Sequence, residues 1–133
     1  MIPKRIFYVW GFGEQKTRDV QICIQSWRNV MPDYEIIEIN EQSKRYFDWQ
    51  AELKRSKFFR VMYKNRLWAF MADYIRLRVL YENGGIYCDT DIQTIKSLNK
   101  FLENPAFVGL QNPAYTEPAI LGAHAKNEFL RKV

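Results

Sequence analysis

The segment 61–91 constrains the fold more than any other part of the chain. Its first part repeats apolar residues at helical spacing and predicts a helix over about 61–82. The run Asn83-Gly84-Gly85 ends this helix, because glycine readily adopts the left-handed conformation that follows helix C-termini. A short apolar strand, 86–88, comes next, and two carboxylates, Asp89 and Asp91, follow it directly. The side of the helix expected to face the core consists of Trp68, Met71, Ala72, Ile75 and Val79.

The acidic pair Asp89-Thr90-Asp91 allows several interpretations. In an extended strand alternate residues share a face, so the two carboxylates are expected to point the same way. A metal ion, an arginine or water must then offset their repulsion. A solvated turn, in which the aspartates bond their own backbone, is the ordinary interpretation of such a tripeptide. The position directly after an apolar strand favours a functional site instead.

Two other acidic motifs also contain two aspartates one residue apart. An EF-hand is excluded, because Thr94 and Lys100 stand where that calcium loop needs glycine and glutamate. A phosphatase of the haloacid dehalogenase type remains an alternative, with Asp89 as the nucleophile. That family places its acidic pair on the first strand, with a threonine two residues after the second aspartate. Here Gln93 occupies that position and the pair comes late in the chain.

The remaining apolar segments predict an α/β domain with a mainly parallel sheet flanked by helices. The strand 2–10, a helix over 17–29 capped by Thr17, and the strand 34–39 form a βαβ unit with a right-handed crossover. Ligands bind at the carboxyl ends of the strands in such sheets, so Trp10 and the acidic pair are expected to be neighbours. The other expected elements are a helix over 43–59, strands over 92–95, 106–110 and 119–123, and a helix from about 126.

Composition narrows the class of protein. A chain of 133 residues suffices for one compact domain. A net charge of +5 favours anionic partners, but no nucleic-acid-binding motif accompanies it, so no nucleic acid is expected. Cys23 and Cys88 fall in apolar segments and are expected to be reduced, as in a cytoplasmic protein. No signal peptide and no stretch of about 20 apolar residues is found in the sequence.

Asp73 and Arg76 lie three residues apart, on one face of the expected helix, and can bond each other. When these two residues are taken alone, a structural ion pair explains them as well as a binding site does. Taken as one run, ADYIRLRVLYENGGIYCDTD (72–91) resembles the sugar-binding region containing the DXD motif of glycosyltransferase family 32. That family includes capsular-polysaccharide-type transferases, and the glucosyltransferase domain of large clostridial toxins is related to it. The segments IPKRIFYVW (2–10), Ser26-Trp27 and PDYEI (32–36) are also similar to the family pattern.

The resemblance implies a GT-A-type, Rossmann-like fold, with residues 1–133 as a single nucleotide-sugar-binding domain that is incomplete at its C-terminus. It implies a hexosyltransferase of polysaccharide biosynthesis that moves a sugar from a UDP- or GDP-sugar donor to a glycan or lipid-linked acceptor. The cofactor would be Mn²⁺ or Mg²⁺, and the anomeric configuration would be retained. A non-catalytic fragment that binds the donor or a glycan in the same pocket is the alternative from another class.

The same resemblance assigns roles to individual residues. Asp89, Asp91 and Arg76 would be catalytic: Asp91 touches the metal, and Asp89 reaches it through water while holding the ribose or the sugar. Asp73 would accept hydrogen bonds from sugar hydroxyls, and Arg76 would bridge sugar and phosphate. Trp10 matches the aromatic residue on which the base stacks, although a core tryptophan closing the sheet explains it too. Ala72 departs from the family, since many relatives have serine there.

A cluster of basic residues surrounds Phe58 and Phe59. A solvated helix face is the ordinary interpretation of such a cluster. The alternative is a patch that contacts anionic lipid at the inner face of a membrane, where a lipid-linked acceptor would be presented. The cluster consists of Lys54, Arg55, Lys57, Arg60, Lys64 and Arg66.

Overall fold

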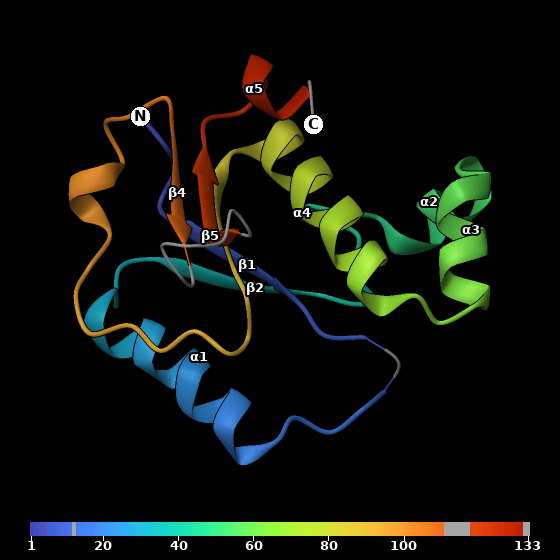
Figure 1. The fold of residues 1–133 in the computed structure, drawn as a ribbon, viewed down its shortest axis with the longest axis horizontal. Helices are drawn as coiled ribbons and strands as arrows, with labels where there is room; N and C mark the ends of the chain where they lie inside the picture. Colours follow the sequence, from blue (N-terminus) through green and yellow to red (C-terminus); the bar gives the residue numbers. More distant parts are fainter. Residues whose placement is uncertain (12, 111–117, 132–133) are drawn as a thin grey trace.

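A five-stranded sheet with helices on both faces forms the centre of the molecule (Figure 1). The structure is a computed structural model, and it describes residues 1–11, 13–110 and 118–131. The first half contains β1 (Arg5–Val9), α1 (Arg18–Val30), β2 (Glu35–Ile39), α2 (Trp49–Arg55) and α3 (Lys57–Lys64). The second half contains α4 (Trp68–Asn83), β3 (Gly85–Cys88), the 3₁₀ helix η1 (Asn99–Phe101), β4 (Ala106–Leu110), β5 (Pro118–Ala123) and α5 (Glu128–Arg131).

The strand order is β2-β1-β3-β5-β4. Strand β1 lies between β2 and β3 and runs parallel to both, while β5 runs antiparallel to both β3 and β4. Of the described strands, only β5 is therefore reversed, and the sheet is mixed but mainly parallel. The predicted βαβ unit is confirmed, with α1 crossing between the parallel pair β1 and β2.

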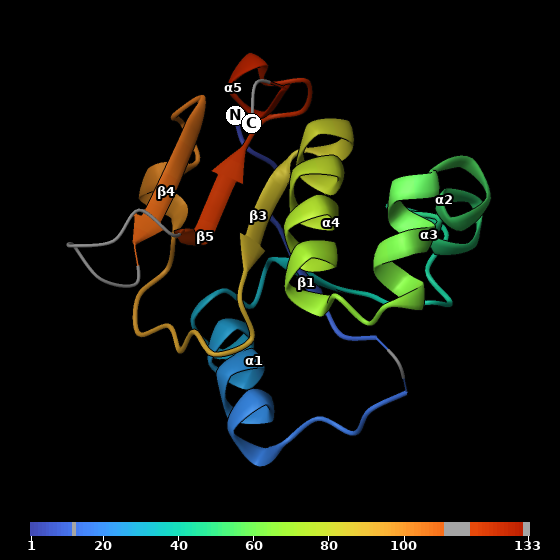
Figure 2. The ribbon, with the colours of Figure 1, turned by 45° about the vertical axis from the view of Figure 1, so that its right-hand side comes forward.

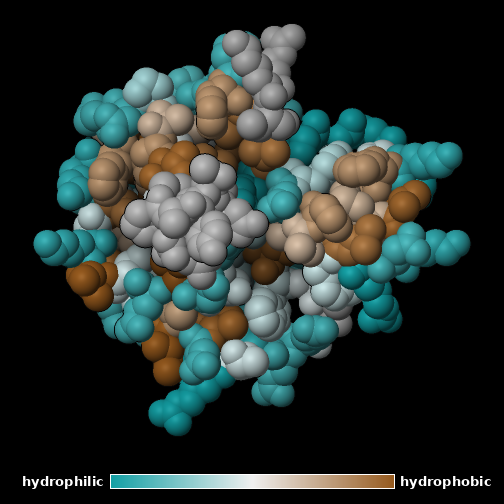
Figure 3. Space-filling view, in the orientation of Figure 1, coloured by the Kyte–Doolittle hydropathy of each residue, from teal (hydrophilic) through white to brown (hydrophobic). Residues whose placement is uncertain are grey.

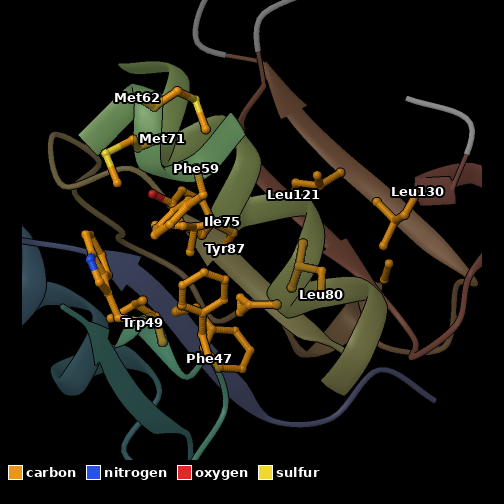
Figure 4. Close-up of a cluster of buried hydrophobic side chains, with 14 residues drawn as sticks. Phe47, Trp49, Phe59, Met62, Met71, Ile75, Leu80, Tyr87, Leu121 and Leu130 are labelled. Atoms are coloured by element: carbon orange, nitrogen blue, oxygen red, sulfur yellow. The ribbon is translucent and has the colours of Figure 1, made fainter. Parts of the chain in front are cut away.

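Alternating residues of the strands divide the core into two layers. Phe7 and Tyr87 face a cluster built with α2, α3 and α4, whereas Ile6 and Ile86 face a cluster built with α1. Figure 2 shows α1 and α4 on different sides of the strands. In the first cluster, the ring of Trp49 meets Phe47, Phe59 and other side chains of the helical layer (Figure 4). The site described below lies at the edge of this layer.

The prediction of a single helix over 43–59 is wrong. Two shorter helices, α2 and α3, meet at Ser56, which has an extended backbone. Ser56 ends α2 by donating its backbone N–H to Glu52 O, and its side chain accepts from Phe59 N to begin α3. A serine that caps both helices therefore competes with continuous helix. The long helix also begins later than predicted, at Trp68, because α3 ends at Lys64.

The prediction of a strand over 92–95 is also wrong, since residues 92–94 form no regular structure and Ile95 lies in a bend. Side chains of α1 bind its backbone groups instead of a neighbouring strand. Trp27 Nε1 donates to Ile92 O at 2.7 Å, and Thr94 N donates to Ser26 Oγ at 2.9 Å. The segment is thereby fixed against α1 directly after the acidic pair.

The glycine pair after α4 sets the direction of β3, and here a substitution has a clear expected cost. Gly85 has φ +138°, and a Cβ atom there would lie 2.8 Å from Arg5 Cγ and 3.0 Å from Arg5 O. We expect Gly85→Ala to lower the free energy of unfolding by about 1–3 kcal/mol, because strain and crowding add. Denaturant unfolding measures the change, with Gly13→Ala as the control: Gly13 has φ +65° but no atom within 4 Å of its Cβ position. Equal losses in the two variants would exclude crowding as the cause.

Candidate active site

The candidate site lies where the carboxyl ends of β1 and β3 meet the N-terminal half of α4. Trp10 follows β1, and Asp89 follows β3. The two strands are parallel neighbours, so these residues come to the same edge of the sheet, as predicted. A hollow of 270 Å³ opens there, and it is lined by Val9, Trp10, Gly11, Glu14, Trp49, Trp68, Ala69, Met71, Ala72 and Thr90.

Arg76 holds the polar end of the site together. Its Nη2 lies 3.1 Å from Asp89 Oδ1 and 3.4 Å from Asp73 Oδ1. Its guanidinium group lies 4.8 Å from the ring centroid of Tyr87, a cation–π contact with a buried tyrosine. The side chain of Arg76 is 12% exposed, whereas Asp73 is 64% exposed. The predicted bond between Asp73 and Arg76 is therefore present, and Arg76 also ties α4 to the end of β3.

The two aspartates of the motif have different surroundings. Strand β3 ends at Cys88, and Thr90 and Asp91 lie in a turn closed by Ile92 N donating to Asp89 O at 3.1 Å. Alternation along a strand therefore does not set their directions, and that part of the prediction is wrong. Asp89 is 34% exposed and paired with Arg76, while Asp91 is exposed. The turn leaves one carboxylate held by a cation and the other facing solvent.

The negative charge of Asp91 extends toward α1. Burial raises the pKa of the Cys23 thiol, and the charges of Asp91 and Asp19 raise it further. Cys23 belongs to α1, so the charge of Asp91 acts on a group of that helix. Cys23 and Cys88 are both free thiols.

The site offers few protein ligands to a metal ion. Over residues 1–11, 13–110 and 118–131, no group of three or more His, Cys, Asp or Glu side chains could hold a metal by itself. Mg²⁺ and similar cations are often bound by one or two carboxylates, with phosphate oxygens and water completing the coordination. Asp91, exposed and carrying a hard oxygen donor, with Asp89 two residues before it, fits that mode of binding.

Trp10 forms a wall of the hollow. It is partly exposed, and its Nε1 donates to Glu14 O at 2.8 Å, which fixes the orientation of the indole ring. It also packs against the buried cluster around α1. Part of Trp10 thus packs against the core, and the exposed part lines the same hollow as Ala72 and Thr90.

Other residues at the site were not predicted from the sequence. Trp49 and Trp68 line the hollow beside Trp10, so three indole rings surround it. Trp68 packs against the core as predicted, but it is partly exposed because α4 begins there. No role at the site was predicted for Tyr87, yet its ring lies under Arg76. The sequence does offer one sign of this contact: Arg76 lies on the helix that packs against the strand containing Tyr87.

The family model described as the glycosyltransferase sugar-binding region containing the DXD motif matches residues 17–108. The chain belongs to this glycosyltransferase family. The match contains the whole of α4, β3 and the Asp89-Thr90-Asp91 motif. A phosphatase of the dehalogenase type is not supported by this membership.

Two curated relatives of the glycosyltransferase chain are fungal proteins. Inositol phosphoceramide mannosyltransferase 3 of Schizosaccharomyces pombe is 29% identical over 138 residues, covering 99% of this chain and 36% of the relative. Mannosyl phosphorylinositol ceramide synthase CSH1 of Saccharomyces cerevisiae is 28% identical over 141 residues, covering 100% of this chain and 34% of the relative. The chain thus spans about a third of the length of these relatives.

A solved structure shares the fold. The PaToxG glycosyltransferase superposes with a TM-score of 0.75 at 18% sequence identity, covering 98% of this chain and 58% of that chain. The predicted GT-A-type arrangement of a mainly parallel sheet flanked by helices is therefore confirmed as a part of a larger glycosyltransferase fold.

Proposed function

We propose that this chain forms the donor-binding part of a metal-dependent hexosyltransferase that uses a nucleotide-diphosphate sugar. The observation that carries the proposal is the contact of Arg76 with Asp89 beside the aromatic hollow, at the carboxyl ends of β1 and β3. An aromatic wall suits a base, a guanidinium suits a phosphate, and exposed carboxylates suit sugar hydroxyls or a cation. Trp10 and Asp89 come to this edge of the sheet, and Arg76 of α4 binds Asp89 and Asp73.

The proposed roles follow this order. The base stacks on Trp10, and the diphosphate reaches Arg76, which also orients Asp89. Asp73, exposed one helical turn before Arg76, accepts hydrogen bonds from the hydroxyls of the transferred sugar. Asp91 and Asp89 would hold Mn²⁺ or Mg²⁺, whose charge stabilises the departing nucleoside diphosphate. Transfer with retention needs no covalent nucleophile in a front-face displacement, and none is assigned among these residues.

The acceptor proposed is the polar head group of a lipid. One curated relative is named an inositol phosphoceramide mannosyltransferase and the other a mannosyl phosphorylinositol ceramide synthase, so a mannose-type sugar and a phosphoinositol lipid are the first candidates. A glycan acceptor of polysaccharide biosynthesis is the second. No helix in the part of the chain that the structure describes is long and apolar enough to cross a membrane.

We also propose peripheral contact with an anionic membrane through the helical layer, at the cytoplasmic side. Two of the six residues of the basic cluster have other partners: Arg55 pairs with the buried Glu52 at 2.6 Å, and Arg60 donates to Leu53 O and Lys54 O. Exposed aromatic rings, Phe58 and Phe70, lie on α3 and α4. Figure 3 shows hydrophobic atoms over these helices with hydrophilic side chains projecting around them. Lys64 and Arg66 line a hollow, so the basic side chains left for the contact are Lys54 and Lys57.

Calorimetric titration of the folded chain with GDP-mannose, UDP-glucose and UDP-galactose, each with and without Mn²⁺, tests the donor proposal. Metal-dependent binding of one donor is expected. A folded chain that binds none of them would refute it. Release of free sugar or transfer to an added acceptor would then separate a transferase from a fragment that only binds the donor.

A tryptophan substitution tests the base-stacking role. Trp10→Ala is expected to weaken the free nucleoside diphosphate and the complete donor equally, by about 1–3 kcal/mol, because stacking on the base is common to both. The same titrations measure the effect. Unchanged affinity for both ligands would make Trp10 a residue of the core alone.

A further inference from the structure

A second hollow adjoins the aromatic one. It has a volume of 360 Å³, and Trp68 lines both this hollow and the first one. Its remaining walls carry both signs of charge together with a phenol, and they are Glu41, Tyr63, Lys64 and Arg66. None of these residues has a role in the proposal above for the sugar or the metal.

The carboxylate of Glu41 belongs to the second hollow and approaches Gly11 of the first. A Cβ atom placed on Gly11, which lines the first hollow, would lie 3.1 Å from Glu41 Oε1 and 3.4 Å from Trp49 Cη2. Glu41 Oε2 accepts from the Tyr63 hydroxyl at 3.4 Å. The side chain is half-buried. Glycine at position 11, next to Trp10 in the chain, therefore leaves room for a carboxylate beside the first hollow and the ring of Trp49.

The backbone explains how Glu41 reaches this place. It follows β2 by two residues, and β2 pairs in parallel with β1. Trp10 N donates to Ile39 O at 3.0 Å, so the ends of the two strands are held side by side. Residues just beyond Ile39 thus lie at the same sheet edge as Trp10 and Gly11.

The nucleobases differ in what they offer to such a carboxylate. Guanine presents two adjacent donors, N1–H and the N2 amino group, which can pair with both oxygens of one carboxylate. It also presents the acceptors O6 and N7, which arginine or lysine can bind. Uracil presents one donor, N3–H, between two carbonyl oxygens, so a carboxylate facing it meets acceptors on both sides. The combination of one carboxylate with two cations therefore matches guanine better than uracil.

We propose that Glu41 reads the base of the donor and selects guanine over uracil, so that the donor is a GDP-sugar. This inference rests on the proposed function in one respect, the placing of the base in the aromatic hollow. The two oxygens of Glu41 accept from N1–H and the N2 amino group. Lys64 and Arg66, on the wall of the second hollow, face the acceptors O6 and N7.

The backbone at Arg66 supports a role for its side chain. Arg66 has φ 55°, in the left-handed region. Arg66 N donates to Tyr63 O and Leu67 N donates to Met62 O, the pair of bonds that ends a helix in a Schellman motif. Glycine is the usual residue at this position because it adopts the conformation without strain. An arginine there gives up local stability while placing a guanidinium at the hollow.

The first test uses the unaltered chain and three free nucleotides. Affinities for GDP, inosine diphosphate and UDP are measured by calorimetry at one Mn²⁺ concentration. Inosine diphosphate lacks only the N2 amino group of GDP, so it removes one of the two proposed bonds to Glu41. We expect affinity to fall in the order GDP, inosine diphosphate, UDP, with GDP bound about 5- to 150-fold more tightly than UDP.

The second test uses Glu41→Gln, with Glu35→Gln as the matched control. Glu35 stands at the other end of β2 and is exposed, paired with Tyr46 and Arg45. Glutamine offers one acceptor and one donor, so the preference for GDP over inosine diphosphate is expected to disappear in Glu41→Gln and to persist in Glu35→Gln. Circular dichroism of both variants verifies folding.

The outcomes separate this inference from the proposed function. Binding of UDP as tight as that of GDP, or a preference for GDP over inosine diphosphate that survives Glu41→Gln, would overturn the role of Glu41 and leave a nucleotide-sugar site standing. A folded chain that binds no nucleotide would overturn the proposed function itself.

Discussion

Asp91→Asn is expected to bind the nucleotide-sugar donor no more tightly with Mn²⁺ than without it. Asp91 is exposed in the turn after β3 and is the carboxylate of the motif that Arg76 does not hold. An amide oxygen carries no net charge and is a much weaker ligand for a hard divalent cation. Since the metal stabilises the leaving diphosphate, turnover should fall by about 10²- to 10³-fold or more. Titration of the donor at several Mn²⁺ concentrations measures the metal dependence directly.

Asp19→Asn is the matched control for this variant. Asp19 lies in the first turn of α1, is exposed, and, like Asp91, contributes to the raised pKa of Cys23. Removing either charge is expected to lower the pKa of that thiol, so its rate of alkylation at fixed pH should rise in both variants. Only Asp91→Asn should lose the effect of Mn²⁺ on donor binding. Metal-dependent affinity that persists in Asp91→Asn would refute its assignment as a metal ligand.

The features that the sequence predicts well are those set by neighbours along the chain. The βαβ unit follows from two short apolar segments separated by one helix, and the end of α4 follows from Gly84, which has φ 75°. The bond between Asp73 and Arg76 follows from their spacing of three on a helix. The same local rules fail at Ser56, because a residue that can cap one helix end can also cap the next.

Features that depend on distant parts of the chain are not visible in local patterns. The segment after the acidic pair contains β-branched residues, but Ser26 and Trp27 of α1 bind its backbone, and it forms no strand. Glu41 and Trp49 reach the site only because β2 pairs with β1 and the helical layer folds over the sheet edge. Their positions follow from tertiary contacts, which no spacing in the sequence encodes.

The second large effect is expected at Arg76, whose substitution distinguishes a binding site from a structural ion pair. Arg76→Lys keeps the charge but loses the planar, forked donor group that contacts Asp73, Asp89 and the ring of Tyr87. If Arg76 bridges sugar and phosphate, affinity for the complete donor should fall more than affinity for the free nucleoside diphosphate. Turnover should fall by about 10²- to 10³-fold. Arg78→Lys is the control, since Arg78 lies on the same helix but contacts Glu52, at 3.9 Å.

Stability separates the two interpretations of Arg76. Its carboxylate partners are 34% and 64% exposed, so solvent screens much of the attraction, and we expect Arg76→Lys to cost only about 0–1 kcal/mol of unfolding free energy. A large loss of donor binding with a small loss of stability is the signature of a group that contacts the ligand. The opposite result, a chain that is markedly less stable but binds the donor normally when folded, would mean that Arg76 serves only to fasten α4 to the end of β3. In that case Arg76 would position the acidic motif but would not itself contact the donor.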